Sequence, residues 1–150
     1  MNEIFNSSFE TGLRILLLLS SISPQAISID RITAYDFITI YGKDFDVSNT
    51  NMHGDSNFNF SELAIKRSNC NEGVKEFVLK GLIDINQTDE GFSYQITPTG
   101  QSYVSSLSSE YAELYLATSS VVHKKYSDIS DAKLMTLINQ KAIKELRRKS

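Results

Sequence analysis

Few side chains in this sequence have a type and spacing suited to catalysis or metal binding. The two histidines are His53, in a polar segment, and His123. His53 and Asp55 together could bind a metal ion, but two ligands without a further Cys or His nearby form a weak site. A surface histidine is the simpler interpretation of His53. The single cysteine, Cys70, falls on the apolar side of an expected helix, where cysteine behaves as a small hydrophobic side chain.

The sequence also lacks the short motifs that mark several enzyme classes. It contains no phosphate-binding GxxxxGK[ST] loop, no HExxH and no GxSxG. Its acidic residues are scattered, without the spacing of a metal site or of a general base. We therefore predict that the protein is not an enzyme and needs no metal or cofactor.

The side chains best suited to bind nucleic acid lie together in the segment SELAIKRSN, at residues 61–69. In a helix-turn-helix protein, the N-terminal part of the recognition helix faces the base edges. Lys66, Arg67 and Asn69 have side chains of the kinds that contact phosphates or bases. An ordinary polar helix face accounts for them equally well, so both interpretations stay open.

The charge balance argues against a general nucleic-acid coat. The chain has a net charge of −3 and a pI of about 5.4, whereas non-specific binding depends on a basic surface that neutralises phosphates. The basic excess lies in the last third, which ends in Lys141, Lys144, Arg147, Arg148 and Lys149. A solvated helix end is the simpler interpretation of these residues. The alternative is a contact with an acidic partner or with nucleic acid.

Composition places the chain among soluble cytoplasmic proteins. With 150 residues, 41% of them apolar, it can form one domain with a substantial core. A lone cysteine excludes an internal disulfide and fits a reducing cytosol. The apolar run at residues 13–23 is shorter than the roughly 20 residues that span a bilayer. Its surroundings hold Glu3 and Glu10, and not the positive region of a signal peptide.

Hydrophobic patterning predicts three helices in the first 80 residues. The first, at residues 8–22, is apolar on nearly every side, which indicates a helix buried among others. The second begins near Ser28 and carries an apolar stripe. A long polar loop at residues 46–57, rich in Asn, Ser, Asp and Gly, leads to the third. The third spans residues 61–80, with Gly81 placed to end it in a left-handed conformation.

The outer face of this third helix is our first choice for a partner or DNA-binding surface. We expect it to be lined by polar side chains and one glycine: Lys66, Asn69, Gly73, Glu76 and Lys80. Arg67 belongs to the same set of candidate contact residues. The basic end of the last helix, with Lys144, Arg147 and Arg148, is the second choice.

A hairpin and two further helices complete the predicted fold. Alternating apolar residues around a turn predict a hairpin at residues 82–97, which Pro98 ends. One helix then carries an apolar seam from Val104 to Val121, and another begins near Ser130–Asp131. We predict an α+β, mostly helical fold. Its first unit is a winged helix-turn-helix core at residues 1–100, followed by a C-terminal helical extension of two helices at 101–150.

The predicted wing is poorly suited to a phosphate backbone. Residues 81–100 contain no Lys or Arg, and they contain Asp84, Asp89 and Glu90. Because phosphate contacts need positive charge, the hairpin fits a protein surface better than DNA.

Several segments together resemble a known family. They are FNSSFETGLRILLLLSSIS, SIDRITAYDFITIYGKDF, the loop with MHGD, the stretch from SELAIKRSNCNEG to ITPTG, and YSDISDAKLMTLINQKAIKEL. In order and spacing they resemble the small middle component of bacterial ABC three-component systems, over nearly the whole chain. The residues that carry the resemblance best are Phe9, Glu10, Gly12, Leu13, Arg14, Asp30, Arg31, Glu62, Arg67, Gly81 and Leu82.

The resemblance implies a subunit that acts through partners. Its partners would be a large ABC-type ATPase with SMC-like coiled coils and an effector, often a nuclease, as in Lamassu-type anti-phage defence. The small winged-helix subunit would dock on both and meet double-stranded DNA mainly through the complex. Two alternatives are a winged-helix transcription regulator that binds an operator as a dimer, and a metal- or ligand-responsive sensor that uses the His53 loop.

Overall fold

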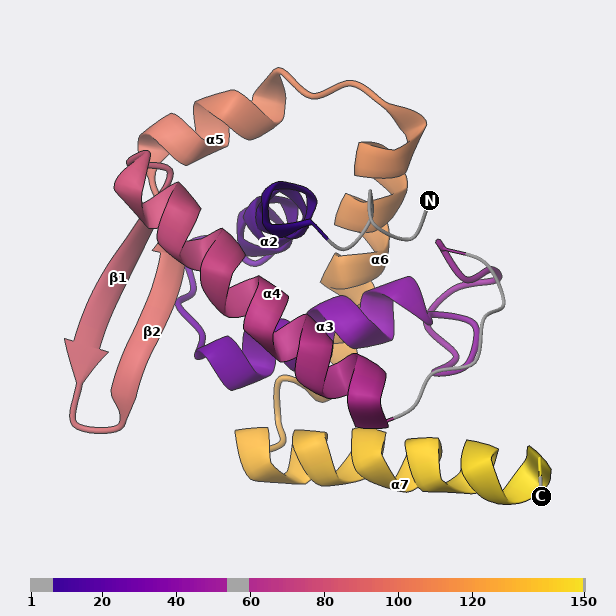
Figure 1. Cartoon of the computed structure of the whole chain (residues 1–150). Coiled ribbons are helices and arrows are strands. Elements are labelled where there is room, and N and C mark those ends of the chain that lie inside the picture. Colours follow the sequence, from indigo (N-terminus) through magenta and orange to yellow (C-terminus); the bar gives the residue numbers. More distant parts are fainter. Residues whose placement is uncertain (1–6, 54–59, 150) are drawn as a thin grey trace.

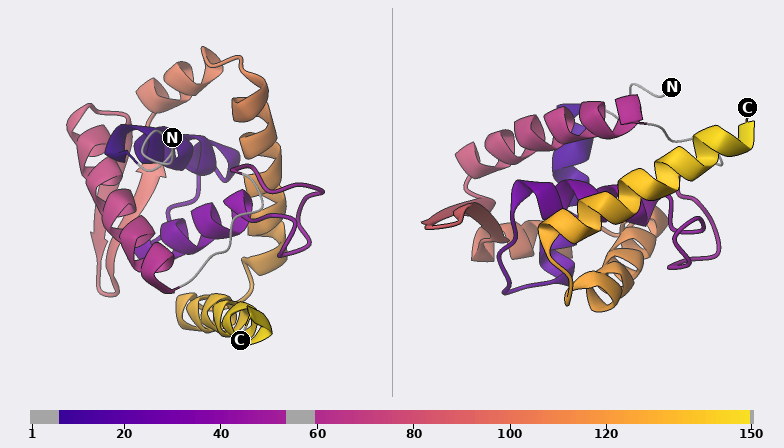
Figure 2. Two further views of the ribbon diagram at one scale, coloured as in Figure 1. Left: turned by 45° about the vertical axis from the view of Figure 1, so that its right-hand side comes forward. Right: turned by 90° about the horizontal axis from the view of Figure 1, so that it is seen from below.

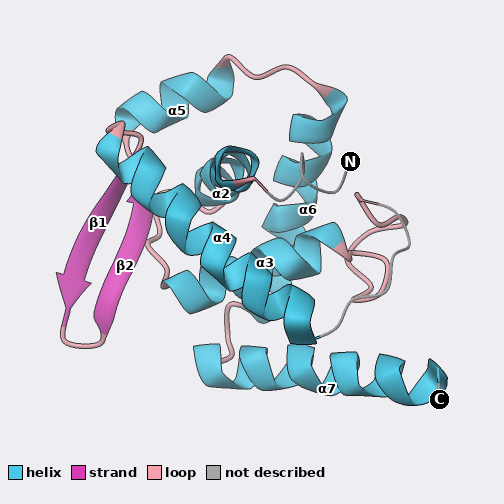
Figure 3. Ribbon diagram, viewed as in Figure 1, coloured by secondary structure: helices cyan, strands magenta, loops and turns pink. Residues whose placement is uncertain are grey.

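The computed structural model of the chain describes residues 7–53 and 60–149, with the backbone alone for residues 60–61 and 145–149. Its helices gather around α2, and one small hairpin lies at the side (Figures 1 and 3). The expected α+β, mostly helical class is therefore confirmed. In chain order the elements are α2 (Ser8–Ser21), α3 (Ile29–Ile40), α4 (Phe60–Leu79), β1 (Ile83–Thr88), β2 (Gly91–Ile96), α5 (Pro98–Ser105), α6 (Glu110–Tyr126) and α7 (Asp131–Lys149).

Helices α2 and α3 form the centre of the fold. Each begins with a serine N-cap: the hydroxyl of Ser7 accepts from the N–H of Glu10, and that of Ser28 accepts from the N–H of Arg31. The sequence predicted an apolar stripe on one side of the second helix. Instead, every residue of α3 from 31 to 40 is buried, because α2, α4, α6 and α7 all contact it.

Helices α2 and α4 approach closely where two glycines meet. A Cβ on Gly73 would lie 2.9 Å from the backbone nitrogen of Gly12 and 2.9 Å from the carbonyl oxygen of Ser8. A Cβ on Gly12 would lie 2.6 Å from the ring of Phe77. Gly73 is therefore buried against α2, and the prediction that it lines the outer face of this helix was wrong. The close backbone contact, for which only glycine leaves room, turns it inward.

The last helical residue of α4 is Leu79, and Gly81 follows it in the left-handed conformation that the sequence predicted. Gly81 has a φ of +76°, and its N–H donates to the carbonyl of Val78 at 3.0 Å. The N–H of Leu82 donates to the carbonyl of Phe77, also at 3.0 Å. These two bonds form a Schellman motif, which satisfies the last carbonyls of the helix and turns the chain directly into β1.

The expected hairpin at residues 82–97 is confirmed. Its strands pair antiparallel, from Ile83 opposite Ile96 to Thr88 opposite Gly91. Ile27, in the segment before α3, bridges to β2 through Tyr94. Strand β2 therefore lies between β1 and that segment, and β1 forms the outer edge of the sheet (Figure 1).

Three helices follow the hairpin in the described residues, where the sequence predicted two. Residues 106–109 separate α5 from α6, and Ser109 caps the new helix. Because the helix restarts there, its apolar face is shifted by one residue relative to the predicted seam. Leu114 and Val121 are exposed, whereas Tyr115 and Val122 are buried.

Helix α7 closes the core beneath α3. It buries Leu134, Ile138 and Ala142 in the same hydrophobic cluster as the residues of α2 and α3. Figure 2 shows it lying across the underside of the fold. Within residues 7–53 and 60–149, no helix combines the length and apolar character needed to cross a membrane.

Candidate functional site

A buried carboxylate, Asp36 of α3, lies where four helices meet. Its side chain is fully buried. Arg14 of α2, with 2% of its side chain exposed, donates from Nε to Oδ1 at 2.9 Å and from Nη2 to Oδ2 at 3.2 Å. Such a two-pronged pair is the strongest geometry between an arginine and a carboxylate. It links α2 directly to α3.

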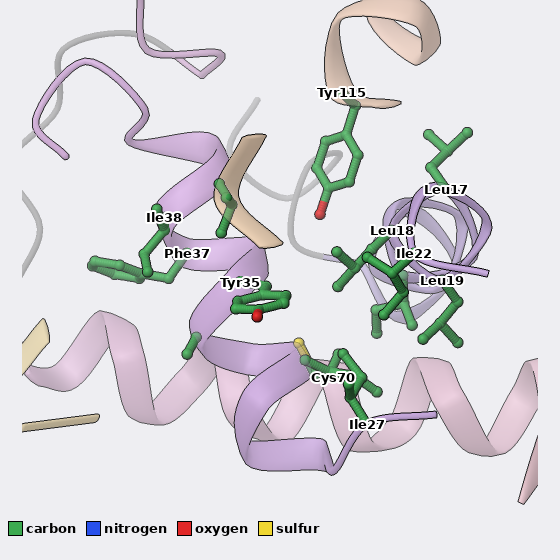
Figure 4. Packing of buried hydrophobic residues seen from close by; sticks show 14 of the residues in the cluster. Leu17, Leu18, Leu19, Ile22, Ile27, Tyr35, Phe37, Ile38, Cys70 and Tyr115 are labelled. Carbon is green, nitrogen blue, oxygen red and sulfur yellow. The ribbon is translucent and has the colours of Figure 1, made fainter. Parts of the chain in front are cut away.

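Two further side chains complete the bonding of Asp36. Lys66 of α4 places its Nζ 3.3 Å from Oδ2, and the hydroxyl of Tyr115 on α6 donates to Oδ1 at 2.5 Å. Figure 4 shows Tyr115 pointing from α6 into the space between α2 and α3. We call these four residues the Asp36 junction. Lys66 is only 6% exposed, so the prediction that it lies on the outer face of this helix was wrong. The buried carboxylate attracts its ammonium group inward.

The charges around Asp36 keep this carboxylate ionised. Burial alone would raise the pKa of Asp36, but the positive charges of Arg14 and Lys66 lower it well below its usual range. Burial also opposes the charge on Arg14, yet the nearby carboxylate raises the pKa of Arg14 overall. Burial raises the pKa of Tyr115 well above its ordinary value, so its hydroxyl keeps the proton that it donates. These pKa shifts all move away from neutrality, which suits a structural junction.

His53 and Tyr111 lie beside the Asp36 junction. His53 Nε2 is 2.7 Å from the hydroxyl of Tyr111, and the two rings stack with centroids 5.9 Å apart. Burial and the charge of Arg14 lower the pKa of His53 to about 4, so it is neutral at pH 7. His53 is thus half-buried and hydrogen-bonded, whereas the sequence suggested a simple surface histidine.

Among the described residues, the weak metal site proposed for the His53 loop gains no further ligand. Asp55 lies outside the described residues. Residues 7–53 and 60–149 contain no group of three or more His, Cys, Asp or Glu side chains that could hold a metal ion.

Arg31, at the start of α3, fastens the connection between α6 and α7. Its Nε donates to Asp131 at 2.6 Å, and its other nitrogens donate to the backbone carbonyl oxygens of Tyr126, at 3.1 Å, and of Ile129. The hydroxyl of Ser28 donates to the second oxygen of Asp131 at 2.5 Å. The N-cap of α3 and an arginine of its first turn therefore both bind the first residue of α7.

The exposed cations of α4 also pair with carboxylates, and so does Lys80, which follows the helix. The pairs, with their N–O distances, are Arg67–Asp30 at 2.9 Å, Lys75–Glu72 at 3.6 Å and Lys80–Glu76 at 3.7 Å. Lys80 also lies 5.1 Å from the centre of the Phe9 ring. Arg67 and Lys80 are exposed, and Asn69 and Glu76 are half-buried. Their role as partner or DNA contacts stays a prediction, but Arg67 and Lys80 are each balanced by a carboxylate.

The basic end of α7 is described in part. Lys144 is exposed. The helix continues through Arg147 and Arg148, whose side chains lie outside the described residues. Lys141 is engaged within the fold, because its Nζ lies 5.1 Å from the centre of the Phe45 ring.

Cys70 is buried, as its place on the apolar side of the helix predicted. Burial and the charge of Asp36 raise the pKa of its thiol to about 12. Figure 4 shows it among the packed residues of the core. A thiol that stays protonated and out of solvent acts as a packing group.

A family model described as "ABC-three component (ABC-3C) system Middle Component 2" matches residues 4–148. The chain belongs to this family. No curated protein and no solved structure shows a comparable match. The region matched by the family model includes the Asp36 junction, the Arg31 contacts and the hairpin.

In this middle component, Asp36 and Tyr115 are the central residues that sequence reasoning missed. A usable signal existed for Asp36. Arg14 is the one charged residue in LRILLLL, and Asp36 is the one in AYDFITI. Because a charge in an apolar helix needs a buried partner of opposite sign, these two could have been paired. Lys66 is followed by the polar residues Arg67, Ser68 and Asn69, and Tyr115 is not a charged residue, so neither carried such a signal.

Proposed function

We propose that this middle component is a non-catalytic structural and regulatory subunit of a cytoplasmic complex built on an SMC-like ABC ATPase. A three-component system supplies two further components as partners. We take these to be the ATPase and an effector such as a nuclease, in a Lamassu-like anti-phage arrangement. The subunit docks on the ATPase and keeps the effector inactive until foreign DNA is sensed.

The observation that carries this proposal is that the charged and hydroxyl side chains of the Asp36 junction are buried between helices. Arg14, Asp36, Lys66 and Tyr115 are each no more than 6% exposed, and they bind one another across four helices. A site that handles a substrate leaves reactive groups facing a cleft. Here these groups hold helices together, which is what a scaffold subunit requires.

The solvent-exposed side of α4 supports docking on a protein, although it is not the strip through Lys66 and Gly73 that the sequence predicted. Beside its ion pairs it exposes Ile65 by 58% and Leu79 by 88% of their surfaces. Large exposed apolar side chains among polar ones are typical of surfaces that bind proteins. Its cations are balanced by nearby carboxylates, so it offers little net attraction to phosphate.

The proposal includes a winged helix-turn-helix arrangement of the first five elements. The order α2, α3, α4, β1, β2 fits that motif, with α4 in the place of the recognition helix and the hairpin as the wing. Because the wing has no cation and Lys66 faces the core, we assign this motif to protein binding. Any contact with double-stranded DNA is secondary and made through the complex.

Co-purification tests the proposal directly. The tagged middle component, expressed with the other two components of its system, should elute with the ATPase in a fixed ratio. Ile65→Glu should reduce that recovery, since it places a charge on the exposed apolar part of α4. Leu114→Glu is the matched control, because Leu114 is also an exposed aliphatic side chain, 43% accessible, but lies on α6.

DNA binding provides the contrary outcome. The isolated protein should bind duplex DNA only weakly, and without preference for its own promoter. Sequence-specific nanomolar binding to that promoter by the isolated protein would instead establish a transcription regulator. In that case Arg67→Ala should abolish the binding and reduce its salt dependence.

A further inference from the structure

Strand β1 forms an open edge of the sheet. In the part of the chain that the structure describes, the sheet has two strands, and Ile27 bridges only to β2. Figures 1 and 3 show β1 on the outside of the hairpin. All its residues after Ile83 are exposed. A strand in this position can pair with a further strand from another chain.

The pairing shows which backbone groups face outward. Tyr94 donates to Ile27 at 2.8 Å and accepts from it at 3.0 Å, so the N–H and C=O of Tyr94 point away from β1. In an antiparallel pair its partner Ile85 must then direct its own N–H and C=O away from β2. Gln87, two residues on, does the same. Among the described residues, neither Ile85 nor Gln87 makes a backbone hydrogen bond outside the hairpin.

This edge lacks several of the devices that usually prevent pairing. The strand IDINQT contains no Lys or Pro, and its register with β2 has no bulge. One face of the hairpin is apolar and extends beyond the core. Ile83 and Ile96 are buried at its base, while Ile85 is 45% and Phe92 54% exposed further out. The other face of β1 carries Asp84.

We propose that β1 binds an extended segment of another component of the system, which joins the sheet as an additional strand beside β1. This inference rests on the proposed function, because it names the docking edge and the chemistry of the partner. The segment alternates apolar side chains, which pack beside Ile85, with Lys or Arg on the opposite face. The partner segment is expected to be basic because the hairpin is acidic: residues 81–100 contain Asp84, Asp89 and Glu90 and no cation.

A second copy of the same chain does not have this chemistry. Pairing of two β1 strands would bring two acidic hairpins together, including the Asp84 of each. Like charges at neighbouring positions of a sheet are destabilising. A basic segment is attracted to the same edge, and its backbone satisfies the outward groups of Ile85 and Gln87.

Hydrogen exchange on the full-length wild-type protein tests this assignment. The other two components are purified separately, immobilised in turn, and the one that binds is used as the probe. In the complex, the amides of Ile85 and Gln87 should exchange about tenfold more slowly than in the free protein. The exchange rate of the Phe92 amide should be unchanged. Unchanged exchange at Ile85 and Gln87 within a formed complex overturns this inference and leaves the proposed function standing. If neither component binds the wild-type chain, both fail.

A pair of proline variants provides the matched control. Ile85→Pro removes an outward N–H of β1 without removing a bond between the two strands, and it should raise Kd roughly tenfold. Phe92→Pro also removes an N–H that points outward, but from the β2 edge, so its Kd should stay within about twofold of wild type. Equal losses for the two variants, or no loss for Ile85→Pro, would contradict the proposal. Thermal unfolding checks that both variants fold.

Charge variants keep the test decisive if Ile85→Pro does not fold. Replacing the three acids together, as Asp84→Asn, Asp89→Asn and Glu90→Gln, should weaken binding and reduce its dependence on salt. A salt dependence equal to that of wild type overturns the basic character of the partner segment. Sedimentation of the isolated chain tests whether a second copy binds this edge instead. A dimer that Ile85→Lys abolishes would assign the edge to a second copy and overturn the proposal.

Discussion

Arg14 and Asp36 form a buried ion pair that joins α2 to α3 through two hydrogen bonds, of 2.9 and 3.2 Å. Removing both charges from water is costly, and attraction offsets that cost only when the remaining polar atoms also find partners. Lys66 and Tyr115 supply those partners from two other helices. The arrangement of the four helices therefore depends on the complete junction.

Asp36→Asn should destabilise the protein by about 3–5 kcal/mol. The substitution preserves the shape of the side chain but leaves two buried cations without a counter-charge. Chemical denaturation at pH 7 measures the loss. The double variant Asp36→Asn/Lys66→Met should be more stable than Asp36→Asn alone, because one uncompensated charge is gone. A double variant that is less stable than the single one would show that Lys66 acts independently of Asp36.

Asp30→Asn is the control for this experiment. Asp30 pairs with Arg67 at 2.9 Å, the same distance as between Arg14 Nε and Asp36 Oδ1, but both side chains are about half exposed. Exposed pairs contribute roughly 0–1 kcal/mol, so its effect should be several times smaller. Comparable losses at Asp30 and Asp36 would mean that burial does not set the strength of these contacts.

The extent of the secondary structure could be predicted well from local signals. The start of the second helix near Ser28, the glycine that ends α4 and the alternation in the hairpin each depend on nearby residues, and each lies where expected. The break at residues 106–109 could not be predicted so easily. A heptad-like seam runs through it in the sequence, but Ser109 caps a new helix in a shifted phase.

The candidate site was less predictable because it depends on tertiary contacts. Lys66 lies one helical turn from Leu63 and from Cys70, so it is on the buried side of its helix, and Asp36 of a different helix supplies the counter-charge that it needs there. Gly73 is a similar case, since its close contact is with Gly12 of α2. Arg14 and Asp36 did carry information, because isolated charges in apolar helices require partners.

His53 should make the stability of the protein depend on pH in mildly acidic conditions. Its folded-state pKa is about 4, whereas that of an unfolded histidine is about 6.5. Between these values the unfolded chain binds the extra proton, so stability falls as pH decreases from about 6.5 towards 4. Because His53 is only half-buried, we expect an effect of about 1 kcal/mol.

Denaturation of wild type and His53→Gln across this pH range measures that effect. The variant retains a polar side chain beside Tyr111 but does not titrate, so its stability should change less between pH 7 and 5. His123→Gln is the comparison variant, because it removes a different titrating histidine and leaves the contribution of His53 in place. The pKa of His123 is also lowered, by burial and by Arg31, but His123 lies next to Tyr35 and Gln25 on another part of the fold. Identical pH profiles for wild type and His53→Gln would contradict the prediction.

Gly73→Ala should destabilise the crossing of α2 and α4 by about 1–3 kcal/mol. Its methyl group would lie 2.9 Å from backbone atoms of Gly12 and Ser8, which cannot move aside as a flexible side chain can. Thermal unfolding measures the change. Ser68→Ala, at an exposed position of the same helix, should be neutral or slightly stabilising because alanine is the better helix former. A stable Gly73→Ala would show that the two helices can separate without cost.

The Arg31–Asp131 pair should govern how firmly α7 is attached. Asp131→Ala removes the partner of Arg31 Nε and of the Ser28 hydroxyl. Since Asp131 is 43% exposed in its side chain, we expect a modest loss of about 1 kcal/mol. Arg31→Met should cost more, roughly 2–3 kcal/mol, because two backbone carbonyls also lose their donor.

Amide hydrogen exchange distinguishes loosening of α7 from general unfolding. In Asp131→Ala, exchange should accelerate in α7 while α2 keeps its wild-type protection, because the contacts of α2 with α4 and α6 are untouched. Asp128→Ala, an exposed acid in the same connection, serves as the control and should change neither helix. Equal acceleration in α2 and α7 would show that the pair stabilises the whole fold, and that α7 does not open separately.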